Sequence, residues 1–179
     1  EAENGPAEEQ AHALNRIGDS RYYQQDIAGA LASSLEAEKR LIAAGATDGE
    51  AMAGTLANIA TFYTGVGQPE KNVPLQERSL KIRTGLYGQD PEGIAPPDAK
   101  ALGLGYLNYA AALYEANRFG DAAEYVDPAI KGLIRGGMTD TTLFVALSTG
   151  ANIYIDAGRQ VDALRLARQG IAMGNELLP

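Results

Sequence analysis

The amino-acid sequence predicts an all-α protein, an α-solenoid of eight antiparallel helices arranged as four hairpins. Small residues recur at the same spacing in four places along the chain. Within each set, a turn-forming segment lies between the first and second small residue. Such repeats are typical of solenoids, in which each hairpin buries its apolar face only against its neighbours.

The second and third members of each set lie 12 and 19 residues after the first. The four sets are Gly18, Ala30, Ala37; Ala60, Asn72, Ser79; Ala110, Ala122, Ala129; and Ala151, Ala163, Gly170, with Asn72 in place of the expected alanine. Two antiparallel helices approach most closely where their side chains are smallest, and larger apolar residues interdigitate around those points. The spacing therefore predicts a helical hairpin in each copy.

The turns come from the segments "YQQD", "GVGQP", "EANRFG" and "DAGRQ". Glycine and proline interrupt helices, and Pro69 stands where the first turn of a helix tolerates proline. We therefore expect helix pairs near residues 8–24 and 27–44, 48–65 and 69–87, 98–116 and 119–136, and 140–157 and 160–177.

Apolar side chains keep helical spacing on one face of the first and last copies, at Leu14, Ile17, Leu31, Leu35, Leu147, Tyr154, Leu164 and Ile171. We place Tyr63, Tyr109 and Tyr154 in the core because they fall where helices should meet. The segment "YGQDPEGIAPPDAK" should form a loop, since Pro96 and Pro97 cannot lie in the middle of a helix. Pro74 and Pro128 fall inside expected second helices and predict local bends there.

These residues resemble the tetratricopeptide repeat family, whose pattern has a small residue, an aromatic three residues later, a glycine at the turn and two alanines in the second helix. Ala60, Tyr63 and Gly67 match its first half, as do Ala151, Tyr154 and Gly158. Ala122 and Ala129 match its second half.

The repeat spacing of 41 and 42 residues resembles the longer variant found in kinesin light chains and in many bacterial repeat proteins. The resemblance implies a right-handed solenoid and one domain over residues 1–179, with repeats near 8–46, 47–90, 97–137 and 138–177 after a flexible lead at 1–7.

In this architecture the first helices line a concave groove, so we expect function there. The candidate binding residues on their exposed faces are Asn15, Asp19, Tyr22, Asn58, Thr61, Asn108, Ala111, Tyr114 and Asn152. Amides offer the donors and the acceptor that an extended peptide backbone needs, and tyrosines add contact area at low entropic cost. The sequence therefore predicts a module that binds a peptide segment of a partner protein, neutral to basic because the chain has a net charge of -8.

Other classes of function lack the residues they need. No nucleophile and base, spaced carboxyl pair or phosphate loop is visible, so we expect no enzyme and no cofactor. The cysteine count is 0 and His12 is the single histidine, so we expect no metal site. No apolar run or basic cluster suits a membrane or nucleic acid.

A second interpretation stays open: an oligomerisation or regulatory domain cut from a larger bacterial protein, which associates through its C-terminal end face. The sequence stops just after an apolar second helix, and the ends of solenoids normally need a polar cap. Self-association through the last hairpin would provide one. Because the sequence starts with Glu1, in the polar segment "EAENGPAEEQ", we favour an exported or periplasmic location over the cytoplasm.

Overall fold

The computed structural model describes residues 5–177. The chain forms two compact units, and the division falls between Leu86 and Tyr87. Within the described range the chain is helical, with connecting turns and no strand. The all-α fold class predicted from the sequence is confirmed.

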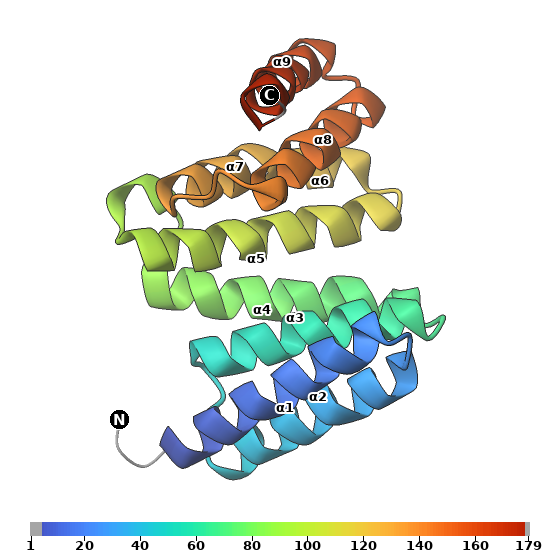
Figure 1. Cartoon of the computed structure of the whole chain (residues 1–179), viewed down its shortest axis with the longest axis vertical. Coiled ribbons are helices and arrows are strands. Elements are labelled where there is room, and N and C mark those ends of the chain that lie inside the picture. The colour runs from blue at the N-terminus through green and yellow to red at the C-terminus, as the bar shows by residue number, and fades with distance from the viewer. Residues whose placement is uncertain (1–4, 178–179) are drawn as a thin grey trace. The chain divides into compact units, whose positions relative to one another are not determined.

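The first unit contains α1 (Gly5–Tyr23), α2 (Ile27–Ala43), α3 (Glu50–Gly65), the short 3-10 helix η1 (Pro69–Lys71) and α4 (Asn72–Tyr87), whose last residue lies past the division (Figure 1). Helix α1 packs along α2, and α3 covers both. Asp26 caps α2, since its carboxylate accepts a hydrogen bond from the Gly29 amide at 2.9 Å. The predicted helix ranges agree with these to within a few residues.

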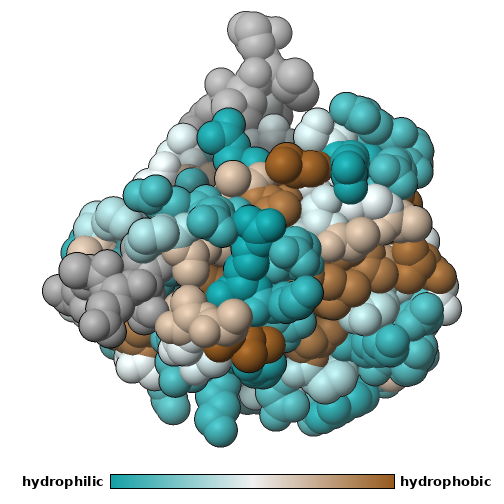
Figure 2. Space-filling view, turned by 90° about the horizontal axis from the view of Figure 1, so that it is seen from below, coloured by the Kyte–Doolittle hydropathy of each residue, from teal (hydrophilic) through white to brown (hydrophobic). Residues whose placement is uncertain are grey.

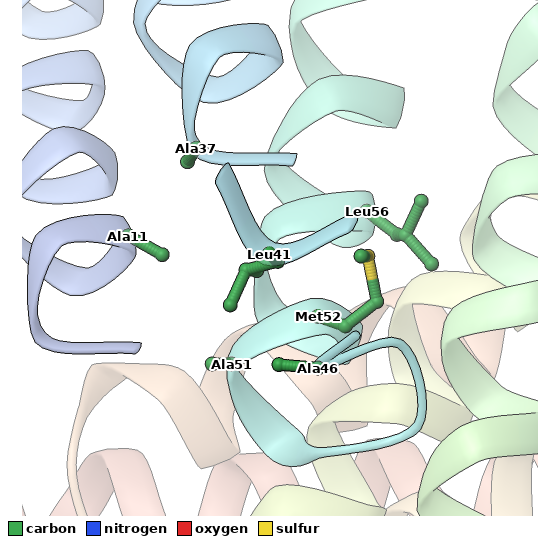
Figure 3. Close-up of a cluster of buried hydrophobic side chains, with 7 residues drawn as sticks. All are labelled: Ala11, Ala37, Leu41, Ala46, Ala51, Met52 and Leu56. Atoms are coloured by element: carbon green, nitrogen blue, oxygen red, sulfur yellow. The ribbon is translucent and has the colours of Figure 1, made fainter. Parts of the chain in front are cut away.

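A cluster of small and flexible apolar side chains fills the space between α1, α2 and α3 (Figure 3). Its members are Ala11, Ala37, Leu41, Ala46, Ala51, Met52 and Leu56. The alanines bring the helix backbones close together, and leucine and methionine fill the gaps that remain. Of the small residues at fixed spacing in the sequence, Ala37 belongs to this cluster.

The second unit contains η2 (Pro91–Gly93), α5 (Pro96–Glu115), α6 (Phe119–Ala123), α7 (Val126–Arg135), α8 (Thr141–Asp156) and α9 (Gln160–Leu177). Helix α5 packs against α6 and α7, α8 covers those two, and α9 packs on α8. A Cβ on Gly132 would lie 2.6 Å from the Cα of Gly103, so α5 and α7 touch backbone to backbone.

The expectations for Pro96, Pro97 and Pro128 are confirmed, whereas Pro74 is the third residue of α4, which begins directly after η1. Pro96 and Pro97 begin α5 and do not interrupt it, and the segment before them is a loop that contains η2. Pro128 is the third residue of α7, and the expected second helix of this hairpin is divided at Glu124 and Tyr125. The proline has no N–H to bond the carbonyl four residues earlier, so the helix breaks just before it.

Four of the residues with helical apolar spacing are not buried. Ile17, Leu35, Leu164 and Ile171 are 46%, 36%, 52% and 65% exposed, although their spacing matches a buried stripe. The core tyrosines Tyr109 and Tyr154 are buried, whereas Tyr63 is only half-buried. Figure 2, which looks onto the side where α1 and α2 lie in Figure 1, likewise shows hydrophobic residues (brown) exposed among hydrophilic ones. Helical periodicity shows which residues share a face, but not whether a neighbour covers that face.

Candidate functional site

In the first unit, a polar pair lies on the faces of α1 and α3. Asn58 donates a hydrogen bond from Nδ2 to Oδ1 of Asp19 at 3.2 Å. Partial burial raises the pKa of the Asp19 carboxyl above its ordinary value. Thr61, one turn further along α3, is exposed, and its hydroxyl donates to the carbonyl of Ala57 at 3.1 Å. The structure therefore brings Asp19 and Asn58 together at a surface that also carries Thr61.

Aromatic side chains adjoin this pair at the end of α1. Tyr22 is 36% exposed and packs on Phe62 of α3 with ring centroids 5.4 Å apart. Tyr23 is 83% exposed, and its ring meets the edge of Tyr22 at 6.1 Å. The buried Phe62 holds Tyr22 in place from below, so the tyrosine presents a supported aromatic surface to solvent.

The prediction that Asn15 lines this surface is wrong. Its side chain is buried; it donates to Oγ1 of Thr55 at 2.7 Å and accepts from the Ser34 hydroxyl at 3.0 Å. The Thr55 hydroxyl in turn donates to the carbonyl of Ala51. Asn15 therefore links α1, α2 and α3 inside the unit and stabilises their packing.

In the second unit, the corresponding surface centres on Tyr114 of α5. Its hydroxyl donates to Oδ2 of Asp156 on α8 at 2.6 Å, and its ring lies 5.3 Å from that of Phe119. The hydrogen bond to Asp156 raises the pKa of Tyr114, because the bond stabilises the protonated phenol. A tyrosine and a carboxylate thus lie side by side on the faces of two first helices.

The other predicted residues of this unit lie in two places. Asn108 and Ala111 are half-buried on α5, on the same helix as Tyr114. Asn152 is exposed on α8 and lines a groove of about 510 Å³ between α8 and α9. The rest of that groove is mainly apolar and was not predicted as a site: Phe144, Leu147, Ser148, Ala151, Ile155, Leu166, Ala167, Gly170, Ile171 and Gly174. The run of apolar and small residues in α9 could have predicted this groove from the sequence.

Residues 5–177 contain no group of three or more metal-ligating side chains. In that range, too, each helix is too short or too polar to cross a membrane. What the two surfaces offer is aromatic area, amides and carboxylates, which are groups that recognise other molecules by contact and hydrogen bonding.

Comparison with known proteins agrees with this repeat architecture. Residues 52–92 match the family model described as tetratricopeptide repeat. The comparison with curated proteins finds no match.

Solved structures of similar fold extend the likeness to almost the whole chain. BtubC (BKLC) from P. vanneervenii superposes with a TM-score of 0.74 at 14% identity, over 93% of this chain and 64% of that one. A putative kinesin light chain from Podosopora anserina with nearly identical TPR-like repeats gives 0.77 at 13% identity, over 94% and 76%. A Rap protein complexed with competence and sporulation factor gives 0.75 at 17% identity, over 94% and 44%.

At these identities the structural likeness shows the fold. The chain spans about two thirds of the length of BtubC and less than half of the Rap protein. The match to the tetratricopeptide repeat family covers residues 52–92, and the fold of almost the whole chain is similar to that of TPR-like kinesin light chain repeats.

Proposed function

We propose that this tetratricopeptide repeat protein is a protein–protein interaction module that binds an extended, neutral to basic segment of a partner protein on the exposed faces of its first helices. The fold supports the general role, because a Rap protein of similar fold was solved in complex with competence and sporulation factor. The surfaces of the two units support the more specific proposal, that the module binds an extended segment.

The observation that carries the proposal is the recurrence of tyrosine at one repeat position. Tyr22 follows the small residue Gly18 by four positions, and Tyr114 follows Ala110 by the same number. Each ring is held by a phenylalanine and remains accessible to solvent at its outer side. A supported, rigid aromatic side chain loses little entropy on binding, which suits it as an anchor.

Charge favours a basic segment. Asp19 lies at the surface of the first unit, and Asp156 lies beside Tyr114 in the second. The whole chain has a net charge of -8. A basic peptide would be attracted toward both surfaces, and an acidic one would be repelled.

A peptide array probed with the wild type and with paired variants tests the proposal. Tyr22→Ala with Asn58→Ala alters the first unit, and Tyr114→Ala with Asn108→Ala alters the second. Each pair should weaken capture of basic segments at least tenfold, since a lost amide contact costs about 1 kcal/mol and a lost aromatic anchor about 2 kcal/mol.

Glu77→Gln, on the exposed side of α4, is the control, because it removes one negative charge without touching either surface. Circular dichroism of each variant confirms that the helices remain. Capture that persists through both paired variants would contradict the proposal.

Association through the C-terminal end face is the second candidate. Val161, Leu164 and Ile171 of α9 are 85%, 52% and 65% exposed, which is unusual for apolar side chains on a single helix. Light scattering over a range of concentrations detects a dimer formed by this face, and Leu164→Glu should then restore the monomer.

A further inference from the structure

We infer that Asp19, Tyr22 and Tyr23 form a subsite in the first unit that selects arginine over lysine in the segment that it binds. The inference rests on the proposed function, because it names the side chain that one of the two tyrosine surfaces recognises. The proposed function requires only positive charge, which arginine and lysine share. The subsite distinguishes the two by the shape and hydration of the charged group.

Two successive contacts between α1 and α3 place the carboxylate beside the aromatic side chains. Asn58 donates a hydrogen bond to Asp19 at 3.2 Å. One turn further along both helices, Phe62 packs on Tyr22 with ring centroids 5.4 Å apart. Asp19 precedes Tyr22 by three positions and Tyr23 by four, and residues at these spacings share one face of a helix. The carboxylate is therefore held one helical turn from both tyrosine rings.

The rings of Tyr22 and Tyr23 form an aromatic corner. Their planes are inclined by 75° and their centroids lie 6.1 Å apart. Tyr23 is 83% exposed and Tyr22 is 36% exposed, so both rings can be reached from solvent. The buried Phe62 supports Tyr22 from the inner side. A planar cation can thus cover a ring face while its edge points toward the Asp19 carboxylate.

The Asp19 carboxylate can accept a further hydrogen bond. Asn58 donates to one of its oxygens, and among residues 5–177 no lysine or arginine forms an ion pair with it, although Arg16 lies three positions earlier. Burial raises the pKa of this carboxyl, because the charged form is incompletely hydrated. A cation that donates to Asp19 replaces part of the hydration that burial removed.

Arginine and lysine differ in how they meet such a corner. The guanidinium group is planar and weakly hydrated, stacks on aromatic faces, and carries its donors along its edge in a fixed fork. It can cover a tyrosine ring and donate to the carboxylate at the same time. The lysine ammonium is a compact, strongly hydrated charge without a face to stack. The subsite should therefore bind arginine more tightly, by about threefold or more.

The third copy of the repeat lacks part of this arrangement. Tyr114 stands at the repeat position of Tyr22, but Glu115 stands at the position of Tyr23. The Tyr114 hydroxyl donates to Asp156 at 2.6 Å, so a carboxylate lies beside a tyrosine here as well. Because the second tyrosine of the corner is missing, this surface should attract basic segments without choosing between arginine and lysine.

Two peptides that differ in one side chain test the inference: acetyl-Gly-Arg-Gly-amide and acetyl-Gly-Lys-Gly-amide. Each is titrated at millimolar concentration into the ¹⁵N-labelled chain, and the signals of the Asn58 side-chain amide and the Tyr22 backbone amide are followed. The Asn58 amide bonds the Asp19 carboxylate and therefore reports on its occupation. The arginine peptide should shift both signals to saturation with about threefold or more higher affinity. Since the two peptides carry equal charge, this ratio should persist at high salt.

Variants of the subsite should abolish the difference between the two peptides. Tyr23→Ala removes one ring of the corner, and Asp19→Asn removes the charge. Both side chains are exposed, so the helices should remain intact, which circular dichroism checks. Phe144→Ala, at a phenylalanine of α8 that is 41% exposed, is the aromatic control, and Glu77→Gln on α4 is the charge control. Both controls should keep the preference for arginine.

Equal affinities of the two peptides, no shift with either peptide, or a preference that survives both Tyr23→Ala and Asp19→Asn would overturn the inference. Its failure is distinguishable from failure of the proposed function. An array that captures basic segments equally well with arginine or lysine would support the proposed function and contradict the subsite. An array without capture would contradict the proposed function, whereas selective shifts with the arginine peptide would still support the subsite.

Discussion

At the scale of single residues, Tyr154 has the most unusual environment for a titratable group. Its side chain is completely buried in α8, and the Arg159 guanidinium lies 4.5 Å from its ring centroid. Burial, followed by the nearby Asp127 carboxylate, raises the pKa of the phenol well above its ordinary value. The native state therefore keeps this proton at a pH where an unfolded tyrosine loses it.

A folded-state pKa above the unfolded one gives stability that is fully present below the unfolded pKa and is lost as pH rises through the folded pKa. Above about pH 10, Tyr154 should therefore lower the free energy of unfolding by up to about 1.4 kcal/mol per pH unit. Urea denaturation at pH 8 and pH 11 measures this loss. Tyr154→Phe should reduce it, whereas Tyr23→Phe, at a tyrosine that is 83% exposed, should leave it unchanged.

Asn15 provides a second test, of a buried amide. Asn15→Ala removes the acceptor of the Ser34 hydroxyl and the donor to Oγ1 of Thr55, so we expect a loss of about 1–3 kcal/mol in the free energy of unfolding. Asn152→Ala, at an exposed amide, should change stability by less than about 0.5 kcal/mol. Equal urea midpoints for the two variants would show that the Asn15 network contributes nothing.

Asn15 and Asn152 show how much of the candidate site could be predicted from the sequence. Both were predicted on exposed faces of first helices from helical spacing, and only Asn152 is exposed. The spacing could not reveal that Ser34 and Thr55, on two other helices, would meet the Asn15 amide. Tertiary neighbours decide which polar residue faces solvent, and they lie 19 and 40 residues away in the sequence.

At the scale of elements, the four hairpin turns use one backbone conformation. The residue seven positions after the first small residue has a positive φ in every copy: 65° at Gln25, 80° at Gly67, 59° at Asn117 and 75° at Gly158. This conformation is easy for glycine and tolerated by asparagine, but it is strained for other residues. The turn in the first hairpin therefore carries a strain that the others avoid.

Gln25→Gly should relieve that strain and raise the free energy of unfolding by about 1 kcal/mol, as seen by urea denaturation. The reverse change, Gly158→Gln, introduces the same strain into the last hairpin and should lower the free energy by about as much. A glycine at position 25 that destabilises the protein would mean that the Gln25 side chain makes a contribution larger than the strain.

Helix positions were largely predictable because small-residue spacing and turn residues are local signals. The exception is the division between α6 and α7, where Pro128 signalled a bend but not its place at Glu124 and Tyr125. The open face of α9 was harder still, since buried and exposed copies of a stripe look the same in sequence. Ile130 lies under α8, whereas Ile171 is 65% exposed in the described part of the chain.

At the scale of the whole molecule, the net charge of -8 governs how partners approach. A negatively charged protein attracts basic segments over roughly the Debye length, which is about 10 Å at 0.1 M salt and shorter at higher salt. The attraction acts mainly on the association rate, because the encounter precedes the short-range contacts. Charge should therefore affect how fast a basic segment binds more than how slowly it leaves.

For a basic segment identified on the array, raising the salt from 0.05 to 0.5 M should slow association by about tenfold and change dissociation much less, as measured by stopped-flow or surface plasmon resonance. Asp19→Asn and Asp156→Asn should each lower the salt dependence of the basic segment, since they remove charges at the two tyrosine surfaces. If the association rate of the basic segment does not depend on salt, then short-range contacts, and not the long-range electrostatic attraction of the chain, select the partner.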